Sequence, residues 1–345
     1  MQRRLRPLTA SLALAASAAL VSLVGCGGSN ADPANTLVLY NGQHEQTANA
    51  LIAAFEQKTG ITVQVRSDDE DVLANQIVQE GANSPADLFY TENSPALAFL
   101  SSKGLLSSVT PSTLAEVPAQ YDSPQGDWVG VSARVSVLVY NTNMLQASQL
   151  PTSITQLADP RWKGLIGIAP SETDFQPIVT SLDMSEGATA TVHWLEALKT
   201  NAGDHTYPDN ETLVAQVNSG AVAIGVINNY YWYRERAEIG ASGMHSKIAF
   251  FAPRDPGYVV DVSGAAVLKS SHHQANAERF LAFLVSPQGQ QIIANTDSFE
   301  YPLDPSIPAA GGQIPFASLQ PNPISIAQLG TGATAVALLQ QAQLI

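Results

Sequence analysis

The chain of 345 residues has one cysteine, few basic residues and a low content of charged residues, 13%. Its only cysteine is Cys26, so the rest of the chain offers no disulfide and no thiol chemistry. Sixteen Lys and Arg stand against thirty Asp and Glu, which gives a net charge of −14. This excludes nucleic acid as a partner, because neutralising phosphates needs a basic surface. The acidic balance fits a cationic ligand, although solubility alone would also explain it.

Motifs of catalysis and of internal repetition are also missing. The chain has no nucleophile elbow, P-loop or HExxH motif. No period of 20–50 residues recurs, which excludes a solenoid. We therefore expect a binding protein and not an enzyme. The enzymatic alternative is a glycosidase, in which Glu92 pairs with a second acid, Glu172 or Asp174.

The N-terminal residues are typical of an exported protein. A basic start, "MQRRLRP", precedes the apolar run "SLALAASAALVSLVG", which is too short for a comfortable membrane span. Residues 1–25 are therefore expected to be a signal peptide. The motif "LVGC" resembles the bacterial lipobox, so Cys26 is expected to carry lipid and to anchor the protein on the outer face of the cytoplasmic membrane. The alternative is an ordinary buried cysteine. Residues 26–35 are small and polar and predict a flexible tether.

Strand and helix patterns alternate along the chain. Amphipathic spacing predicts a first helix that ends at Gly60, and acids crowd into the start of a second helix at Asp68–Asp71, where they suit the helix dipole. A metal site in those acids is the alternative. Ser94 is expected to cap a third helix. This order predicts a mostly parallel sheet with helices on both faces. The predicted strands are 36–40, 61–65, 86–90, 165–169 and 221–227.

Two long β-rich stretches, 129–140 and 258–269, lie almost symmetrically about the middle of the chain. If both cross between two lobes, a cleft lies between the lobes and a hinge beneath it. The expected N-terminal lobe is 36–134 with 261–310. The expected C-terminal lobe is 135–260 with 311–345.

Polar residues follow the predicted strands, where ligands bind in open α/β sheets. His44 and Glu92 follow two strands of the first lobe, while "PSETDF" and "NNYYWY" follow two strands of the second. An imidazole, a carboxylate and two phenols suit a hard, highly charged cation, and Fe(III) is the obvious candidate because phenolates need a strong positive charge. Taken singly, His44 could bond to backbone and Glu92 could cap a helix.

Five segments closely resemble the bacterial ferric-ion-binding proteins, the transferrin-like substrate-binding components of ABC iron importers. They are "LVLYNGQHEQTANALIAAFEQKTGITVQV", "PADLFYTEN", "PRWKGLIGIAP", "VINNYYWY" and "DPGYVVDVSGAAVLK". The resemblance begins near Thr36 and weakens past about residue 305. It implies a two-lobed periplasmic-binding-protein fold of type II, with a mixed β-sheet in each lobe, a hinge of two β-crossings and the ligand in the cleft.

The resemblance also implies a set of site residues. The Fe(III) ligands would be His44, Glu92, Tyr230 and Tyr231, while Tyr233 would only pack. A synergistic anion would complete the iron coordination. The residues expected to hold this anion are Arg134, Ser171, Thr173, Asn210 and Asn228.

The sequence departs from the phosphate-using members at one loop. They have a small Ser-Gly-Ala loop where this chain has Glu172-Thr173-Asp174. Two carboxylates would repel phosphate, so carbonate, citrate or Glu172 itself as an internal anion is expected instead. Glu172 and Asp174 could also simply cap the following helix.

The expected function is that of a monomeric, lipid-anchored receptor. It would close over Fe(III) with its anion and deliver the ion to an ABC transporter permease. The rival is another cargo in the same fold: an iron chelate, a polyamine, a sugar or thiamine. Aromatic and acidic residues in the cleft would suit an organic cation through cation–π contacts.

Overall fold

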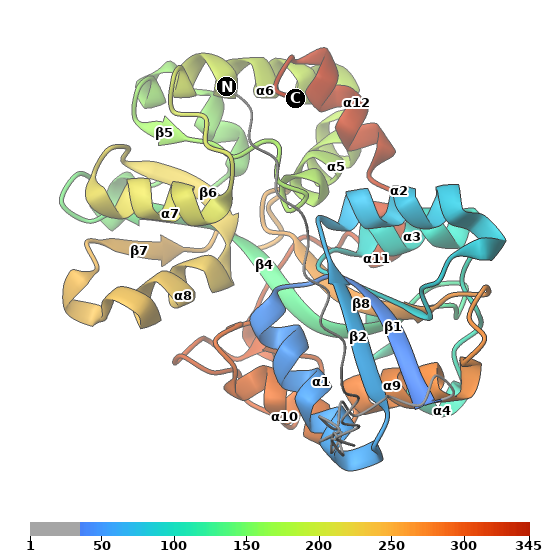
Figure 1. Ribbon diagram of the computed structural model, residues 1–345. Coiled ribbons are helices and arrows are strands. Elements are labelled where there is room, and N and C mark those ends of the chain that lie inside the picture. Colours follow the sequence, from blue (N-terminus) through green and yellow to red (C-terminus); the bar gives the residue numbers. More distant parts are fainter. Residues whose placement is uncertain (1–34) are drawn as a thin grey trace, which may run out of the picture.

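The computed structural model describes residues 35–345. The predicted signal peptide, the lipidated Cys26 and most of the tether lie outside these residues. Two lobes are joined by long strands that pass between them (Figure 1). The elements of the first half are β1 (Thr36–Gly42), α1 (Glu45–Thr59), β2 (Thr62–Ser67), α2 (Glu70–Glu80), β3 (Leu88–Thr91), α3 (Ser94–Ser102), α4 (Pro111–Leu114) and β4 (Val129–Asn141).

The second lobe is built mainly from the middle of the chain. Its elements are β5 (Ile166–Gly167), α5 (Phe175–Glu186), α6 (Ala188–Ala202), α7 (Asn210–Ser219), β6 (Ile224–Asn228), α8 (Asn229–Ile239) and β7 (Ser246–Ala249). The chain then returns through β8 (Val260–Val267), α9 (Gln274–Val285), α10 (Pro287–Asn295), β9 (Tyr301–Pro302), α11 (Ile326–Leu329) and α12 (Ala333–Gln341). The last helix, α12, packs on α5 and α6 of the second lobe (Figure 1).

The strands form one continuous path in the order β2-β1-β3-β8-β4-β6-β5, with β7 and β9 paired to β4. The β1-β2, β1-β3 and β5-β6 pairs are parallel. Every pair that includes β4 or β8 is antiparallel. The expectation of a mostly parallel sheet was therefore wrong, because strand periodicity does not reveal the direction in which a returning strand runs. The sheet is mixed.

Two crossing strands, β4 and β8, connect the lobes. All thirteen residues of β4 are buried, and β4 pairs first with β8 and then with β6 and β7. Its run of Val and other β-formers is what a strand buried on both faces requires. The backbones come very close here, since a Cβ added to Gly130 would lie 2.3 Å from the carbonyl oxygen of Tyr121.

Two helix starts differ from the sequence prediction. Asn93, and not Ser94, is the N-cap residue of α3, and the Ser94 hydroxyl donates instead to Asp261 in β8, at 2.5 Å. At α2 the acidic first turn is present, but the N-cap residue Asp69 makes no side-chain cap. The prediction that Gly60 ends α1 is confirmed, because this glycine adopts the left-handed φ of 70°.

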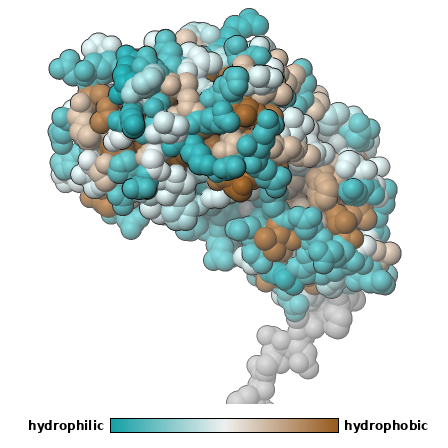
Figure 2. Space-filling view, turned by 90° about the horizontal axis from the view of Figure 1, so that it is seen from above, coloured by the Kyte–Doolittle hydropathy of each residue, from teal (hydrophilic) through white to brown (hydrophobic). Residues whose placement is uncertain are grey.

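The face of the molecule in Figure 2 is largely hydrophilic, with hydrophobic residues in small, separate patches. Between residues 35 and 345, no helix has both the length and the apolar character needed to cross a membrane.

Candidate metal centre

His44 reaches the cleft from the first lobe, immediately before α1. It is the N-cap residue of that helix, but its side chain makes no capping hydrogen bond. The imidazole instead places Nε2 3.2 Å from Oε1 of Glu92, and the side chain is 15 % exposed. The imidazole is therefore aimed at another candidate ligand and is not used by the local backbone.

Glu92 follows β3, in the first lobe. Its carboxylate contacts His44 and accepts a hydrogen bond from the hydroxyl of Tyr230, which belongs to the second lobe. The carboxylate thus lies where the two lobes meet. It joins the imidazole to a phenol. The N-cap residue of α3 is Asn93, not Glu92.

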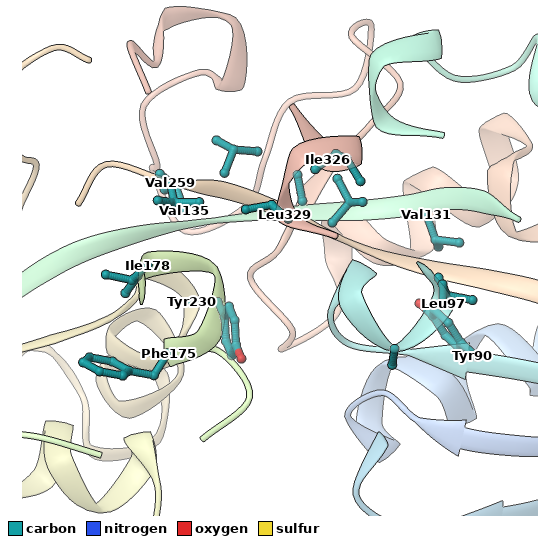
Figure 3. Packing of buried hydrophobic residues seen from close by; sticks show 14 of the residues in the cluster. Tyr90, Leu97, Val131, Val135, Phe175, Ile178, Tyr230, Val259, Ile326 and Leu329 are labelled. Atoms are coloured by element: carbon teal, nitrogen blue, oxygen red, sulfur yellow. The ribbon is translucent and has the colours of Figure 1, made fainter. Parts of the chain in front are cut away.

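Tyr230 and Tyr231 occupy the first turn of α8, directly after β6 ends. Their ring centroids lie 4.1 Å apart, and the His44 ring approaches them edge-on at 5.1 and 6.0 Å. Both side chains are buried. Figure 3 shows Tyr230 beneath the crossing strands, with its hydroxyl oxygen pointing away from them. Tyr233 lies outside the cluster and stacks on Phe299 at 6.0 Å, so it packs as expected.

Asp174 is a member of the cluster for which the sequence offered helix capping as one alternative. It is the N-cap residue of α5, yet its side chain makes no capping hydrogen bond. The capping interpretation is therefore wrong. Instead, Oδ2 accepts hydrogen bonds from the Tyr230 hydroxyl at 3.1 Å and from Nδ2 of Asn210 at 3.4 Å. The other oxygen, Oδ1, is buried without a partner. The sequence did contain a signal for this role, because Asp174 lies in the loop that follows a strand, where ligands bind.

The guanidinium of Arg134 forms an ion pair and a hydrogen bond with other residues of the protein. Its side chain is fully buried in β4, pairs with the fully buried Glu300, and donates from Nη1 to Oδ1 of Asn93 at 3.1 Å. Glu300 follows α10 and belongs to none of the segments that carry the resemblance, so the sequence did not suggest this pair. The Nε of Arg134 is buried without a hydrogen-bond partner, and the guanidinium lies 5.5 Å from the centroid of the Tyr230 ring. The expected role of Arg134 in binding an anion stays a prediction.

The other residues expected to hold an anion are spread around the cluster. Ser171 donates to the carbonyl of Pro208 at 3.3 Å, and the Thr173 hydroxyl accepts from Nδ2 of Asn93 at 3.2 Å. Asn228 ends β6 and lines a small pocket together with Asp174 and Asn210. Among these residues, all within the described part of the chain, only Asn210 hydrogen-bonds to a member of the cluster, and it donates to the Asp174 carboxylate.

The electrostatics of the cluster depend on burial and on its crowded acids. Burial, with Asp174 and Glu92 nearby, raises the pKa of Tyr230 and of Tyr231 well above the ordinary value. Burial and Glu92 raise the pKa of Asp174 to about 6. Burial would also raise the pKa of Glu92, but His44, Arg134 and the Tyr230 hydroxyl lower it to about 2. An empty site thus holds two protonated phenols beside an ionised Glu92.

To act as an internal anion, Glu172 would have to be ionised at neutral pH, and its pKa does not fit this role. Burial, together with Asp174 and Glu92, raises the pKa of this carboxyl to about 9. Glu172 is therefore mainly protonated at neutral pH, and it lines a cavity of about 710 Å³ together with His44 and Glu92. Further acids line the same cavity: Glu45, Asp68, Asp69, Glu70, Asp71 and Asp209.

The donor set suits one kind of cation. Within residues 35–345, no three His, Cys, Asp or Glu side chains are close enough together to hold a metal ion. A metal in this cluster would thus need the phenol oxygens of the tyrosines. Phenolate and carboxylate oxygens with one imidazole favour a hard, highly charged ion over Zn²⁺.

The fold and the cleft define a two-lobed solute-binding protein, and comparisons with known proteins agree. The family model described as bacterial extracellular solute-binding protein matches residues 83–315. The chain belongs to this family. It is 38% identical, over 93% of each chain, to the "Fe(3+)-binding periplasmic protein" of Serratia marcescens.

Two solved structures are also similar over most of the chain. Iron-bound HitA from Pseudomonas aeruginosa is 41% identical, with a TM-score of 0.84, and the match covers 89% of this chain and 99% of that one. A Trichodesmium protein in complex with iron and citrate is 31% identical, with a TM-score of 0.78 and the same coverage. The expected two-lobed fold with a mixed sheet is confirmed.

Proposed function

We propose that this protein is an extracytoplasmic receptor that captures Fe(III) by closing its lobes and delivers the ion to an ABC transporter permease. The observation that carries the proposal is the meeting of His44 and Glu92, from one lobe, with Tyr230 from the other. The iron-binding relatives and the acid-lined cavity support it. It acts as a monomeric binding protein, held at the membrane by lipid on Cys26.

Asp174 supplies the carboxylate that an added anion would otherwise supply. It already contacts the Tyr230 hydroxyl and has a buried oxygen without a partner. With Glu92 and two phenolates it provides four negative charges around a trivalent ion. Because Arg134 is neutralised by Glu300, a further anion would add uncompensated charge. Carbonate or citrate is therefore accessory in this protein, and phosphate is excluded from a site already rich in carboxylates.

The proposal is tested by titrating the iron-free protein with ferric nitrilotriacetate and following visible absorbance. We expect a saturable phenolate-to-iron band at one iron per protein. Tyr230→Phe and Tyr231→Phe should each lose most of the band. Tyr233→Phe, a change of the same size on the same helix, should keep it. Absence of a band in the unaltered protein would contradict the proposal and favour an organic cargo such as a polyamine.

Asp174→Asn tests the source of the carboxylate. The unaltered protein should bind iron without bicarbonate or citrate, because Asp174 fills that position. The variant should lose affinity by about 10- to 100-fold, the range seen when a supporting group at a metal site is removed, and should regain part of it with bicarbonate. Glu172→Gln is the matched control and should change little, because Glu172 is already protonated. Equal anion dependence in both variants would contradict the role of Asp174.

A further inference from the structure

Glu70 is the buried member of the acidic group at the start of α2, for which the sequence offered a helix-dipole role or a metal site. It is 4 % exposed, whereas its neighbours Asp68, Asp69 and Asp71 are exposed. A carboxyl group is buried in this way only when hydrogen bonds compensate for the loss of water. The donors that surround Glu70 therefore indicate its role.

The carboxyl group of Glu70 holds the chain on both sides of Glu92. Oε2 accepts hydrogen bonds from the Thr91 hydroxyl and, at 2.8 Å, from the backbone N–H of Asn93. Oε1 accepts a hydrogen bond from Nδ2 of Asn93 at 3.1 Å. The N–H of Asn93 belongs to the planar peptide group that follows Glu92. Glu70 therefore fixes the backbone that carries this candidate ligand.

Glu70 also lies against the strand end that leads to His44. Gly42 and Thr91 are paired residues of the parallel strands β1 and β3. A Cβ added to Gly42 would lie only 2.7 Å from Cβ of Glu70, so the backbone of Gly42 packs on Glu70 with no room for a side chain. One residue thus contacts both strand ends that bring the first-lobe ligands to the cleft.

This arrangement belongs to the first lobe, so it does not depend on closure of the cleft. Strands β1 and β3 pair with each other, and α2 packs against β1 and α3. The amide of Asn93 is also held at its other end, because Oδ1 accepts a hydrogen bond from Nη1 of Arg134 at 3.1 Å. The backbone around Glu92 is therefore fixed before an ion arrives.

We propose that Glu70 is a positioning residue, which fixes the ends of β1 and β3 so that His44 and Glu92 are presented together to the ion. The inference rests on the iron-binding function proposed above. Glu70 acts from outside the coordination shell and does not bind the ion. Supporting groups of this kind typically contribute 10- to 100-fold to metal affinity, because the ligands need no ordering when the ion binds.

Two simpler roles of Glu70 predict different results. If Glu70 only stabilised the lobe, its loss would lower the free energy of unfolding and leave iron affinity unchanged. If Glu70 acted only through its charge, Glu70→Gln and Glu70→Ala would weaken iron binding equally, with or without an acid at residue 92. A positioning residue predicts a graded loss of affinity that depends on Glu92.

The experiment measures iron affinity, by competition with citrate, and unfolding in urea for the purified protein and its variants. Glu70→Ala should weaken iron binding by about 10- to 100-fold. Glu70→Gln keeps the side-chain length and one acceptor oxygen, so it should weaken binding less. In a Glu92→Gln background each Glu70 variant should cost less affinity than in the unaltered protein, because Glu70 acts partly through Glu92.

Glu80→Ala is the matched control at the other end of α2. The Glu80 carboxylate accepts hydrogen bonds from the Tyr40 hydroxyl at 3.0 Å, from the Ser84 hydroxyl at 2.6 Å and from the Gln76 amide. The control therefore removes a similar set of hydrogen bonds, and none of these partners flanks a candidate ligand. Its iron affinity should equal that of the unaltered protein, whatever its loss of stability.

The outcomes separate the positioning role from the proposed function. Unchanged iron affinity in Glu70→Ala, with a normal absorbance band, would leave iron binding intact and overturn the positioning role. Equal losses in Glu70→Gln and Glu70→Ala, or a loss that is the same in the Glu92→Gln background, would overturn it in favour of a charge effect. A similar loss of affinity in Glu80→Ala would overturn it in favour of lobe stability.

If Glu70→Ala does not fold, the comparison of Glu70→Gln with and without Glu92→Gln decides the question, because these changes keep the size of each side chain. A loss confined to the protein with Glu92 supports positioning, and an equal loss in both contradicts it. If the unaltered protein shows no iron band, both proposals fail.

Discussion

At the scale of single residues, protons and iron compete for the same oxygen atoms. The pKa of each phenol, Tyr230 and Tyr231, is raised well above its ordinary value, so both carry protons when the site is empty. Coordination as phenolates releases both protons. Affinity must then fall as pH falls, because acid returns the protons to the ligands.

We expect about two protons to be released per iron bound at pH 8, after correction for the chelator. For two protons, linkage gives a loss of about a hundredfold in affinity for each pH unit of acidification. Tyr230→Phe and Tyr231→Phe should each release about one proton. The measurement is potentiometric titration of protein with iron, and no proton release would mean that neither phenol binds the ion.

The residues that the sequence identified best are those that follow strands. His44, Glu92 and Tyr230 lie together in the structure, because strand ends of both lobes face one cleft. The sequence could not assign the roles of Asp174 and Arg134. Their partners depend on side-chain direction and on Glu300, which is 166 residues from Arg134 along the chain.

At the scale of elements, the crossing strands depend on close backbone approach. Gly130→Ala would place a Cβ 2.3 Å from the Tyr121 carbonyl oxygen, which belongs to backbone and cannot move aside cheaply. We expect a loss of about 1–3 kcal/mol in the free energy of unfolding, the usual cost of overpacking. Urea denaturation checks this.

Gly243→Ala is the control for the effect of the added methyl group. There the new Cβ would meet only the side chain of Ile239, at 3.2 Å or more. Its free energy of unfolding should change by less than that of Gly130→Ala. Equal effects in the two variants would mean that the crossing strands tolerate a side chain at residue 130.

The strand and helix positions were largely predictable, because each has a clear hydrophobic period and turn residues at its ends. The direction of β8 and the pairing of β7 and β9 with β4 were not. Those features are set by contacts between distant segments, which a local pattern does not record.

At the scale of the whole molecule, several contacts join the lobes across the cleft. Nε2 of Gln176 on α5 lies 3.3 Å from Oδ2 of Asp71 on α2. Asn93 contacts Thr173 at 3.2 Å, and Tyr230 contacts Glu92. Because these contacts span the cleft, the two lobes are in a closed arrangement.

Iron should favour this closed arrangement, because its ligands come from both lobes. Small-angle X-ray scattering should give a smaller radius of gyration for the iron-loaded protein than for the iron-free protein. Gln176→Ala, which removes one closing contact and no ligand, should increase the radius of the iron-free protein only. Identical scattering with and without iron would contradict closure.

The most direct test of the account is resonance Raman spectroscopy of the iron-loaded protein, excited within its visible absorption band. If Tyr230 and Tyr231 bind Fe(III), vibrations of iron-bound phenolate dominate the spectrum. They should weaken in each Phe variant and vanish in the double variant. Iron bound with unchanged affinity in the double variant, or a spectrum without phenolate vibrations in the unaltered protein, would contradict the central claim.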